Sequence, residues 1–396
     1  MNLVFLKIRY DLFMLRKIFD QTSVKMHTRK YQVLNEVRIY KENIIHNLNV
    51  FKSLNPDCYI SAVLKSNAYG HGLRQIAEIL NDSQCEFIDI DGYFEAHKIM
   101  NLTKHKILVM GYILPGNIKL LDNKKCSYVI QDQDSLKALG EDGRNFKVHV
   151  EINTGMNRLG INPNEIKSYL ETLSKYKNLE LEGVMSHLAD ADNPDDSYTD
   201  MQIKVFDKAV AQIHKIGFNP KYIHIAQSAG SAKTKSKYAN VLRVGIGLYG
   251  INPLEKTDNN YSKLTDLRPA MEIQSTIIKV LDLKPGERVS YNGIYKADSE
   301  RKIAALPLGY YEWVPRELSD KGFFTFNQTK LPIRGRVCMN HTMIDISGTK
   351  LSVGDKVCVV SKDNKLNSIQ NYSDKYGLFA YHLLTRTNES IRRTIV

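Results

Sequence analysis

Eight short apolar or alternating runs between residues 31 and 264 constrain the fold of this chain more than any other feature of its sequence. Their length and composition are typical of β-strands. The runs are YISAVLK (59–65), FIDIDG (87–92), KILVMG (106–111), SYVIQ (127–131), FKVHVEI (146–152), LEGVMSH (181–187), YIHIA (222–226) and VLRVG (241–245). Several of the segments between them, such as 73–82, 164–176 and 201–217, carry apolar residues at helical spacing. Eight strands alternating with helices predict a parallel (β/α)8 barrel of the TIM type.

From about Thr265 onward the pattern changes to strands separated by turn signals such as KPGE and VGD. The runs there include MEIQSTIIKVLDL, ERVSYNGIY, KIAALPL, LPIRGRVCMN, TMIDIS and DKVCVV. A chain of 396 residues is also long for one core. We therefore predict an α/β protein with a barrel domain at residues 31–264 and a mostly β C-terminal domain at residues 265–396.

Charge and cysteine content narrow the class of protein. The 55 Lys and Arg against 43 Asp and Glu give a net charge of +12, but the charges are spread along the chain and do not form basic runs with interleaved aromatics. A solvated, lysine-rich surface explains this net charge better than nucleic-acid binding does. The five cysteines have no CxxC spacing, which is typical of reduced thiols in a cytoplasmic protein and predicts neither disulfides nor a zinc site.

Residues 1–30 form an extension with a different composition. Apolar side chains crowd its first part, but Lys7, Arg9 and Asp11 interrupt them, so no stretch is long enough for a membrane span or a signal core. Two interpretations remain: a basic amphipathic helix at an interface, or a dispensable extension upstream of a natural start at Met26.

Polar residues occur where the predicted barrel strands end. Lys65 closes the first strand, His187 the sixth, and His224 and Arg243 lie in the last two. The carboxyl ends of barrel strands form one mouth, which is where such barrels carry their active sites. A lysine amine there, with its charge disfavoured by desolvation, can form a Schiff base with an aldehyde such as pyridoxal phosphate. The glycines of LRVGIGLYG at the eighth strand let backbone amides approach a phosphate.

Seven motifs together resemble one family. AVLKSNAYGHG, NTGMNRLG, SHLADAD, RVGIGLYG, SYNGIY, LGYYEWVPR and GRVCMN occur in this order between Tyr31 and the C-terminus. They resemble the alanine racemases, fold type III pyridoxal-phosphate enzymes with an N-terminal barrel and a C-terminal β domain. The resemblance implies interconversion of L- and D-alanine, a small-molecule amino-acid substrate, a homodimer with shared active sites, and D-alanine for bacterial peptidoglycan.

The resemblance also implies roles for individual residues. Lys65 is the Schiff-base lysine and the acid or base for the D-enantiomer, and Tyr291, from the partner subunit, serves the L-enantiomer. Two bases on opposite faces are what racemisation requires, since a proton removed on one side returns on the other. Arg243 faces the pyridine nitrogen, which a permanent cation keeps unprotonated.

The remaining matches hold the cofactor and substrate. His224 bonds Arg243, His187 packs beside the ring, and Tyr69, Ser228, Gly245 and Ile246 bind the phosphate. By the same resemblance, Arg158 lies near the phenolic oxygen of the cofactor and meets the substrate carboxylate, which the backbone amide of Met339 from the other subunit also meets. Asp192, Tyr310, Arg316 and Arg336 fall at the substrate entrance, where arginines would steer an anion inward.

Four departures from the family pattern concern the pocket and its rim. Glu151 stands where many members have a carbamylated lysine, so we expect it to pair directly with Arg158. Asn340 replaces a common aspartate, and GYYEWVPR replaces the commoner GYADG pattern. The C-terminal LLTRTNESIRRTIV does not clearly provide the tyrosine that often gates the entrance.

Other readings stay open at this point. A broader-specificity or serine-preferring racemase is compatible with the altered rim. A non-catalytic pyridoxal-phosphate carrier also places a lysine on a barrel strand, but such proteins are typically single barrels. A decarboxylase of the same barrel class resembles these motifs much less.

Overall fold

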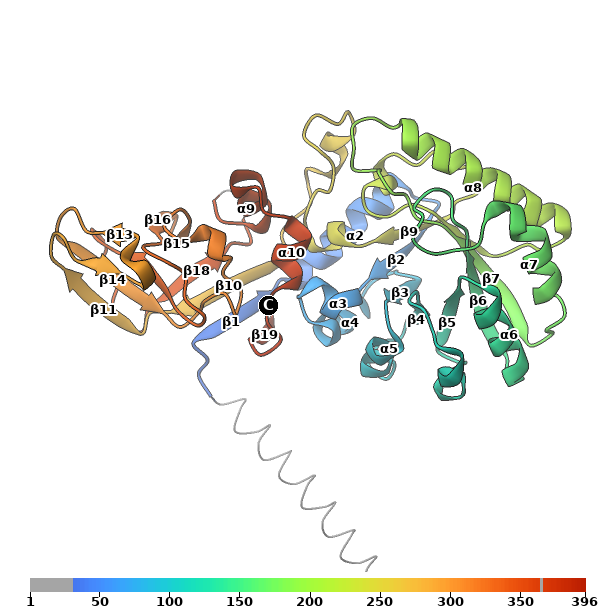
Figure 1. Cartoon of the computed structure of the whole chain (residues 1–396), viewed down its shortest axis with the longest axis horizontal. Helices are drawn as coiled ribbons and strands as arrows, with labels where there is room; N and C mark the ends of the chain where they lie inside the picture. Colours follow the sequence, from blue (N-terminus) through green and yellow to red (C-terminus); the bar gives the residue numbers. More distant parts are fainter. Residues whose placement is uncertain (1–30, 364–365) are drawn as a thin grey trace, which may run out of the picture.

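The computed structural model describes residues 31–363 and 366–396. The barrel lies on the right of Figure 1 and the C-terminal β domain on the left, with the short helix α10 (Ala380–Thr385) between them. The amphipathic helix considered for residues 1–30 lies outside the described residues. Within the described ranges, no helix combines the length and apolar character needed to cross a membrane.

Eight parallel strands form the barrel sheet, in the order β8-β7-β6-β5-β4-β3-β2-β9. Between β8 and β9, N of Arg243 donates to O of Ala226 at 3.1 Å, which brings the two ends of the sheet together. The strands are β2 (Tyr59–Val63), β3 (Phe87–Ile90), β4 (Lys106–Val109), β5 (Cys126–Ile130), β6 (Phe146–Glu151), β7 (Leu179–Met185), β8 (Tyr222–His224) and β9 (Val241–Val244). Each coincides with one of the eight runs in the sequence, so the predicted barrel is confirmed.

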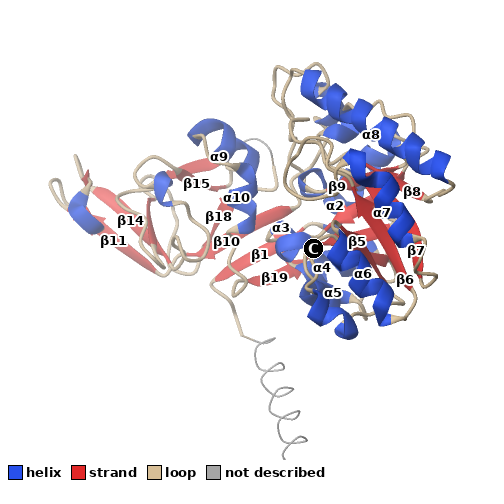
Figure 2. Ribbon diagram, turned by 45° about the vertical axis from the view of Figure 1, so that its right-hand side comes forward, coloured by secondary structure: helices blue, strands red, loops and turns tan. Residues whose placement is uncertain are grey.

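Helices surround this sheet (Figure 2). Each buries one face; in α2, for example, Ile44, Asn47, Leu48 and Phe51 are buried and recur at helical spacing. The α-helices of the barrel are α2 (Lys41–Leu54), α3 (Lys65–Tyr69), α4 (Leu73–Leu80), α5 (Tyr93–Ile99), α6 (Gln133–Asp142), α7 (Ile166–Leu173) and α8 (Ser197–Ile216), and the 3-10 helices up to residue 264 are η1 (Pro115–Leu120), η2 (Pro163–Glu165), η3 (Gly230–Ala232), η4 (Ile246–Tyr249) and η5 (Tyr261–Leu264).

The rest of the chain is mostly β, as predicted. A six-stranded sheet has the order β16-β15-β18-β10-β1-β19, beside a three-stranded sheet β11-β14-β17 and a hairpin β12-β13. The strands are β1 (Asn35–Ile39), β10 (Met271–Thr276), β11 (Lys279–Leu283), β12 (Arg288–Val289), β13 (Tyr295–Lys296), β14 (Arg301–Leu306), β15 (Phe323–Phe326), β16 (Thr329–Pro332), β17 (Thr342–Asp345), β18 (Lys356–Val360) and β19 (Arg392–Ile395). This part also contains η6 (Tyr291–Gly293), η7 (Arg316–Leu318) and α9 (Ile369–Tyr376).

The connection between the two parts is closer than the sequence indicates. β1 precedes the barrel in the chain, yet it pairs antiparallel with β10 and parallel with β19 in the C-terminal sheet. The first described strand and the last strand therefore lie side by side. β19 also lies beside α4 of the barrel (Figure 1), and Arg393 in this strand donates to O of Gly70, at the end of the turn that begins with Lys65.

Candidate active site

Lys65 follows β2 directly and starts an unusual turn. The backbone φ angles of Ser66, Asn67, Ala68 and Tyr69 are 56°, 55°, 53° and 50°. Four consecutive left-handed residues without glycine are costly, at roughly 1–2 kcal/mol each. The turn is therefore held by its surroundings, and it aims a half-buried lysine at the barrel mouth.

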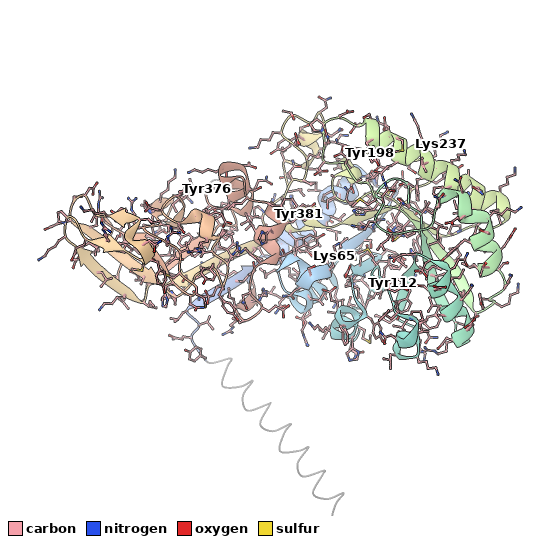
Figure 3. All side chains as sticks on the ribbon, viewed as in Figure 1. Lys65, Tyr112, Tyr198, Lys237, Tyr376 and Tyr381 are labelled. Carbon is pink, nitrogen blue, oxygen red and sulfur yellow. The ribbon has the colours of Figure 1, made fainter. Side chains whose placement is uncertain are left out.

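A cavity of about 420 Å³ opens at this mouth. Its lining includes nine of the residues singled out in the sequence: Lys65, Tyr69, Glu151, Arg158, His187, Ser228, Arg243, Gly245 and Ile246. His224 lies behind the wall and contacts the cavity through Arg243. Figure 3 shows Lys65 and Tyr381 at the junction between the barrel and the C-terminal domain.

The environment of Lys65 favours its neutral form. Burial lowers the pKa of the amine below its ordinary value; Asp91 opposes this, while the charges of Arg158 and Arg243 lower the pKa further. A neutral amine at neutral pH is a nucleophile and a proton acceptor. The lowered pKa increases the fraction of the amine that is available for the covalent and acid–base chemistry expected of it.

Arg243 begins a directional chain of hydrogen bonds through the barrel interior. Its Nη1 donates to Nδ1 of His224 at 2.8 Å, so that this nitrogen carries no proton. Nε2 of His224 then donates to Nδ1 of His149 at 2.8 Å, and Nε2 of His149 donates to Oε2 of Glu182 at 3.3 Å. The permanent cation at one end and the carboxylate at the other fix both histidines as neutral single tautomers.

The protonation states along this chain of hydrogen bonds are consistent with donation from Arg243 toward Glu182. Burial lowers the pKa of His149 and His224, which favours the neutral form of both rings. Burial also opposes ionisation of Glu182, but hydrogen bonds from His149 and Ser127 outweigh it and lower the pKa of Glu182 to about 2. Glu182 is therefore an anion that anchors the far end of the chain.

Arg243 is held from a second side as well. Its Nη2 donates to O of Ser186 at 2.7 Å and to Nδ1 of His187 at 3.1 Å. Burial, followed by the charge of Arg243, holds the pKa of His187 well below its usual range. The guanidinium is thus rigidly oriented beside a neutral histidine in the cavity wall.

The other end of the cavity has small residues and hydroxyl groups. Oγ of Ser228 accepts from N of Gly245 at 2.9 Å and from N of Gly247 at 3.2 Å. A Cβ on Gly245 would lie 2.9 Å from the hydroxyl of Tyr69. Glycine at 245 therefore keeps open a niche lined by a hydroxyl and by the amides that begin η4.

The expected ion pair between Glu151 and Arg158 is wrong. Among the ion pairs of residues 31–363 and 366–396, none joins these two side chains. Arg158 lies on an exposed loop after a left-handed residue, Asn157 (φ 52°), whereas Glu151 is buried at the end of β6. Burial raises the pKa of Glu151, and the charges of Arg243 and Arg158 oppose this from a distance.

Several cavity residues were missed in the sequence. Asp91 follows β3 and Gln227 follows β8, so their positions at carboxyl ends of strands could have identified them. Tyr381 and Thr385 reach the cavity from α10, and no local signal indicated this. The ring of Tyr381 lies 6.1 Å from that of Tyr69. Tyr381 therefore forms an aromatic wall of the cavity and lies just before the segment 383–396, which contains no tyrosine.

The residues expected from a partner subunit lie on the C-terminal domain and do not line this cavity. Tyr291 is 68% exposed and Met339 is 55% exposed. Their loops are joined, because Oγ of Ser290 contacts Sγ of Cys338 at 3.2 Å. N of Tyr310 donates to O of Cys338, which places this entrance residue on the same surface.

The remaining entrance residues are more scattered. Arg316 is exposed at the start of η7, and Arg336 is partly buried. Asp192 is exposed and lines a second cavity, which shares Tyr381 and Ile246 with the first. Of the four predicted entrance residues, only Asp192 thus lies beside the barrel mouth of its own chain.

Comparison with known proteins agrees with this geometry. Residues 39–253 match the alanine racemase N-terminal domain and residues 270–395 match the alanine racemase C-terminal domain. An alanine racemase of Methanococcus maripaludis is 31% identical over 349 residues, covering 86% of this chain and 92% of that protein.

Solved structures show the same fold. An alanine racemase of Clostridium difficile 630 superimposes with a TM-score of 0.85 at 25% identity, over 93% of this chain and 97% of that one. The alanine racemase of Bacillus anthracis with bound L-Ala-P gives a TM-score of 0.83 at 26% identity, over 92% and 96% of the two chains. The Lys65 turn, the oriented Arg243, the barrel and the C-terminal sheets, together with these matches over both domains, show that the chain belongs to the alanine racemase family.

Proposed function

We propose that this protein interconverts L-alanine and D-alanine with pyridoxal 5'-phosphate held in the barrel mouth. The observation that carries the proposal is the cavity that brings the Lys65 amine and the Arg243 guanidinium together. The family supports racemisation of alanine as the activity. The resulting D-alanine would serve peptidoglycan synthesis, a role that rests on the family alone.

The residues present fit this cofactor. The cavity has room for a phosphorylated pyridine ring, and its glycine niche offers the Tyr69 hydroxyl and the amide of Ile246 to a phosphate, while the amide of Gly245, which donates to Oγ of Ser228, would turn to the phosphate on binding. A lysine with a lowered pKa lies in the same cavity. Lys65, Tyr69, Ser228, Gly245 and Ile246 would hold the aldehyde and phosphate ends.

Arg243 would face the ring nitrogen, with His224 and His187 on either side of the guanidinium. When bound, the cofactor supplies an electron-withdrawing ring that acidifies the α-proton of an amino acid. A guanidinium cannot accept a proton and keeps the facing nitrogen unprotonated, which limits that withdrawal and disfavours side reactions. The chain from Arg243 to Glu182 supports this role, since it holds the cation in one orientation.

Proton transfer would involve two residues on opposite faces of the substrate. Lys65 would hold or take the proton on the D-enantiomer side, for which its lowered pKa is suitable. Tyr291 of the partner subunit would do the same on the L-enantiomer side. The exposure of Tyr291 and Met339 on the C-terminal domain, away from their own barrel mouth, supports a homodimer in which each chain completes the other's site.

Arg158 would bind the substrate carboxylate together with the backbone amide of Met339 from the partner. Arg158 is exposed at the cavity rim, so it can reach an incoming anion. Asp192, Tyr310, Arg316 and Arg336 would line the entrance of the dimer. The five cysteines are free thiols, which suits the cytoplasm where we place the enzyme.

Circular dichroism of L-alanine tests the proposal directly. The purified protein, supplied with pyridoxal phosphate, should make the signal of L-alanine decay to zero while the total alanine concentration stays constant. The Lys65→Ala variant should leave the signal unchanged. A persistent signal with the wild-type protein would overturn alanine as the substrate, and the same assay with L-serine would then identify a changed pocket.

A further inference from the structure

The left-handed turn after Lys65 is fixed from outside by one C-terminal side chain. O of Gly70, at the end of the turn, accepts from Nε of Arg393 at 2.9 Å and from Nη2 of the same guanidinium at 2.8 Å. The two residues are 323 positions apart in the sequence. A strained backbone persists only where its surroundings determine it, and this forked contact provides such a constraint.

The same guanidinium also donates hydrogen bonds to backbone carbonyls of the segment that follows α10. Nη2 of Arg393 donates to O of Thr387 at 3.1 Å, and Nη1 donates to O of Asn388 at 3.1 Å and to O of Ile391 at 2.9 Å. Arg393 therefore ties the Lys65 turn to the C-terminal segment with hydrogen bonds on three nitrogens. A planar guanidinium can bridge so many carbonyls, whereas a lysine ammonium cannot span them.

The two glycines of the YGHG motif make room for this contact. Gly70 has φ +80°, and a Cβ there would collide with O of Leu384 in α10. Gly72 has φ +103°, and a Cβ there would lie 2.7 Å from Cδ of Arg393. Both glycines are thus required by left-handed backbone and by the close approach of the C-terminal segment.

Both connected segments form walls of the active-site cavity. The turn carries Lys65 and Tyr69, and α10 carries Tyr381 and Thr385. Lys65 and Tyr381 lie where the barrel meets the C-terminal domain (Figure 3). A contact that fixes one wall relative to the other determines the shape of the space between them.

We propose that Arg393 is a positioning residue that fixes the Lys65 turn against α10 and thereby sets the affinity of the cavity for pyridoxal phosphate. The affinity part rests on the proposed function, since it takes this cofactor as the ligand. Arg393 touches neither ligand nor substrate and acts through Gly70. Arg392 is a matched control, because it is the preceding residue of the same strand and its side chain is exposed.

The test compares full-length wild-type protein with Arg393→Lys, Arg393→Ala and Arg392→Ala. Hydrogen exchange by mass spectrometry, before and after addition of pyridoxal phosphate, reports on residues 66–73, and a fluorescence titration gives the Kd for pyridoxal phosphate. The Lys variant keeps the charge and most of the aliphatic stem, so it retains the fold if the Ala variant does not. Thermal unfolding of all four proteins separates local from global effects.

We expect exchange at residues 66–73 to be about tenfold faster in both Arg393 variants and the Kd to rise about tenfold, with Arg392→Ala within about twofold of wild type. Faster exchange confined to residues 387–396, with an unchanged Kd, would overturn the proposal and leave Arg393 as an anchor of the C-terminus only. If wild-type protein does not bind pyridoxal phosphate, the proposed function fails, and exchange at residues 66–73 still decides whether Arg393 fixes the turn.

Discussion

Nδ2 of Asn340 donates a hydrogen bond to Oε1 of Glu312, with 2.7 Å between the two atoms. Oε2 of Glu312 accepts from N of Gly309 at 2.7 Å. Two departures from the family pattern, Asn340 and the GYYEWVPR segment, therefore contact each other. A glutamate at 312 requires a donor opposite it, so the amide at 340 and the carboxylate at 312 form a compensating pair beside Met339.

Replacing this amide by a carboxylate should disturb the rim. Asn340→Asp places two acceptors and two negative charges at hydrogen-bond distance, next to the Met339 amide expected to bind the substrate carboxylate. We expect KM for L-alanine to rise about fivefold with a smaller change in kcat. Steady-state kinetics of the single variant and of Asn340→Asp with Glu312→Gln check this, since the double variant should regain most of the lost affinity. An unchanged KM in the single variant would show that this pair does not shape the substrate site.

Glu151 should lower stability while supporting function. Burial raises its pKa above the ordinary value of 4.5, with Arg243 and Arg158 opposing. When the pKa of a carboxyl group is higher in the folded state than in the unfolded state, the free energy of unfolding is greatest below the pKa of the unfolded state. It falls as the pH rises through the pKa of the folded state. Glu151→Gln should therefore be more stable than wild type at pH 7 and equal to it below about pH 4. Urea unfolding at both pH values measures this.

The same substitution should impair catalysis. Without the negative charge, Arg158 and Arg243 lose a compensating anion, so KM or kcat for L-alanine should worsen several-fold. Asp134→Asn is a control, because this carboxylate lies on α6 outside the cavity lining. Unchanged kinetic constants in Glu151→Gln would contradict a functional role for the charge.

Glu182 should stabilise the protein through His149. Its pKa is lowered to about 2, so its contribution is present above about pH 4.5 and is lost as pH falls toward 2. Glu182→Gln should lower the free energy of unfolding at pH 7 by about 1–3 kcal/mol, because an amide cannot accept from both His149 and Lys147. Guanidinium unfolding checks this, with Glu180→Gln as control, since Glu180 is an exposed neighbour whose ion pair among the described residues is with Lys147. Equal losses of unfolding free energy in the two variants would contradict a stabilising role for the buried hydrogen bond between Glu182 and His149.

The barrel could be predicted from sequence because its strands are largely buried and read as short apolar or alternating runs, with helical spacing between several of them. The C-terminal domain was harder. The run 271–283 looks like one strand, but β10 and β11 belong to different sheets. β1 and β19 pair across almost the whole chain, and no local pattern encodes a partner so distant.

The residues of the site likewise fall into those that could be predicted from sequence and those that could not. Residues at the carboxyl ends of barrel strands, such as Lys65, His187 and Arg243, could be placed because the barrel defines a mouth. Contacts between separate segments could not: the position of Tyr381 depends on how α10 packs, and Glu151 and Arg158 line the same cavity without forming an ion pair, because Glu151 is buried at the end of β6 and Arg158 is exposed on a loop. The left-handed turn is likewise invisible in KSNAY, since none of its residues is a glycine.

Subunit mixing tests the shared active site. Lys65→Ala and Tyr291→Phe should each abolish racemisation, because each removes one of the two proton-transfer groups. If Tyr291 of one chain serves Lys65 of the other, a heterodimer of the two variants has one site that lacks both groups and one that is intact. Random association of equal amounts gives half heterodimers, so co-expression should restore about a quarter of wild-type activity. If both groups come from the same chain, every site in the mixture lacks one of them and no activity returns, which would contradict the shared-site homodimer.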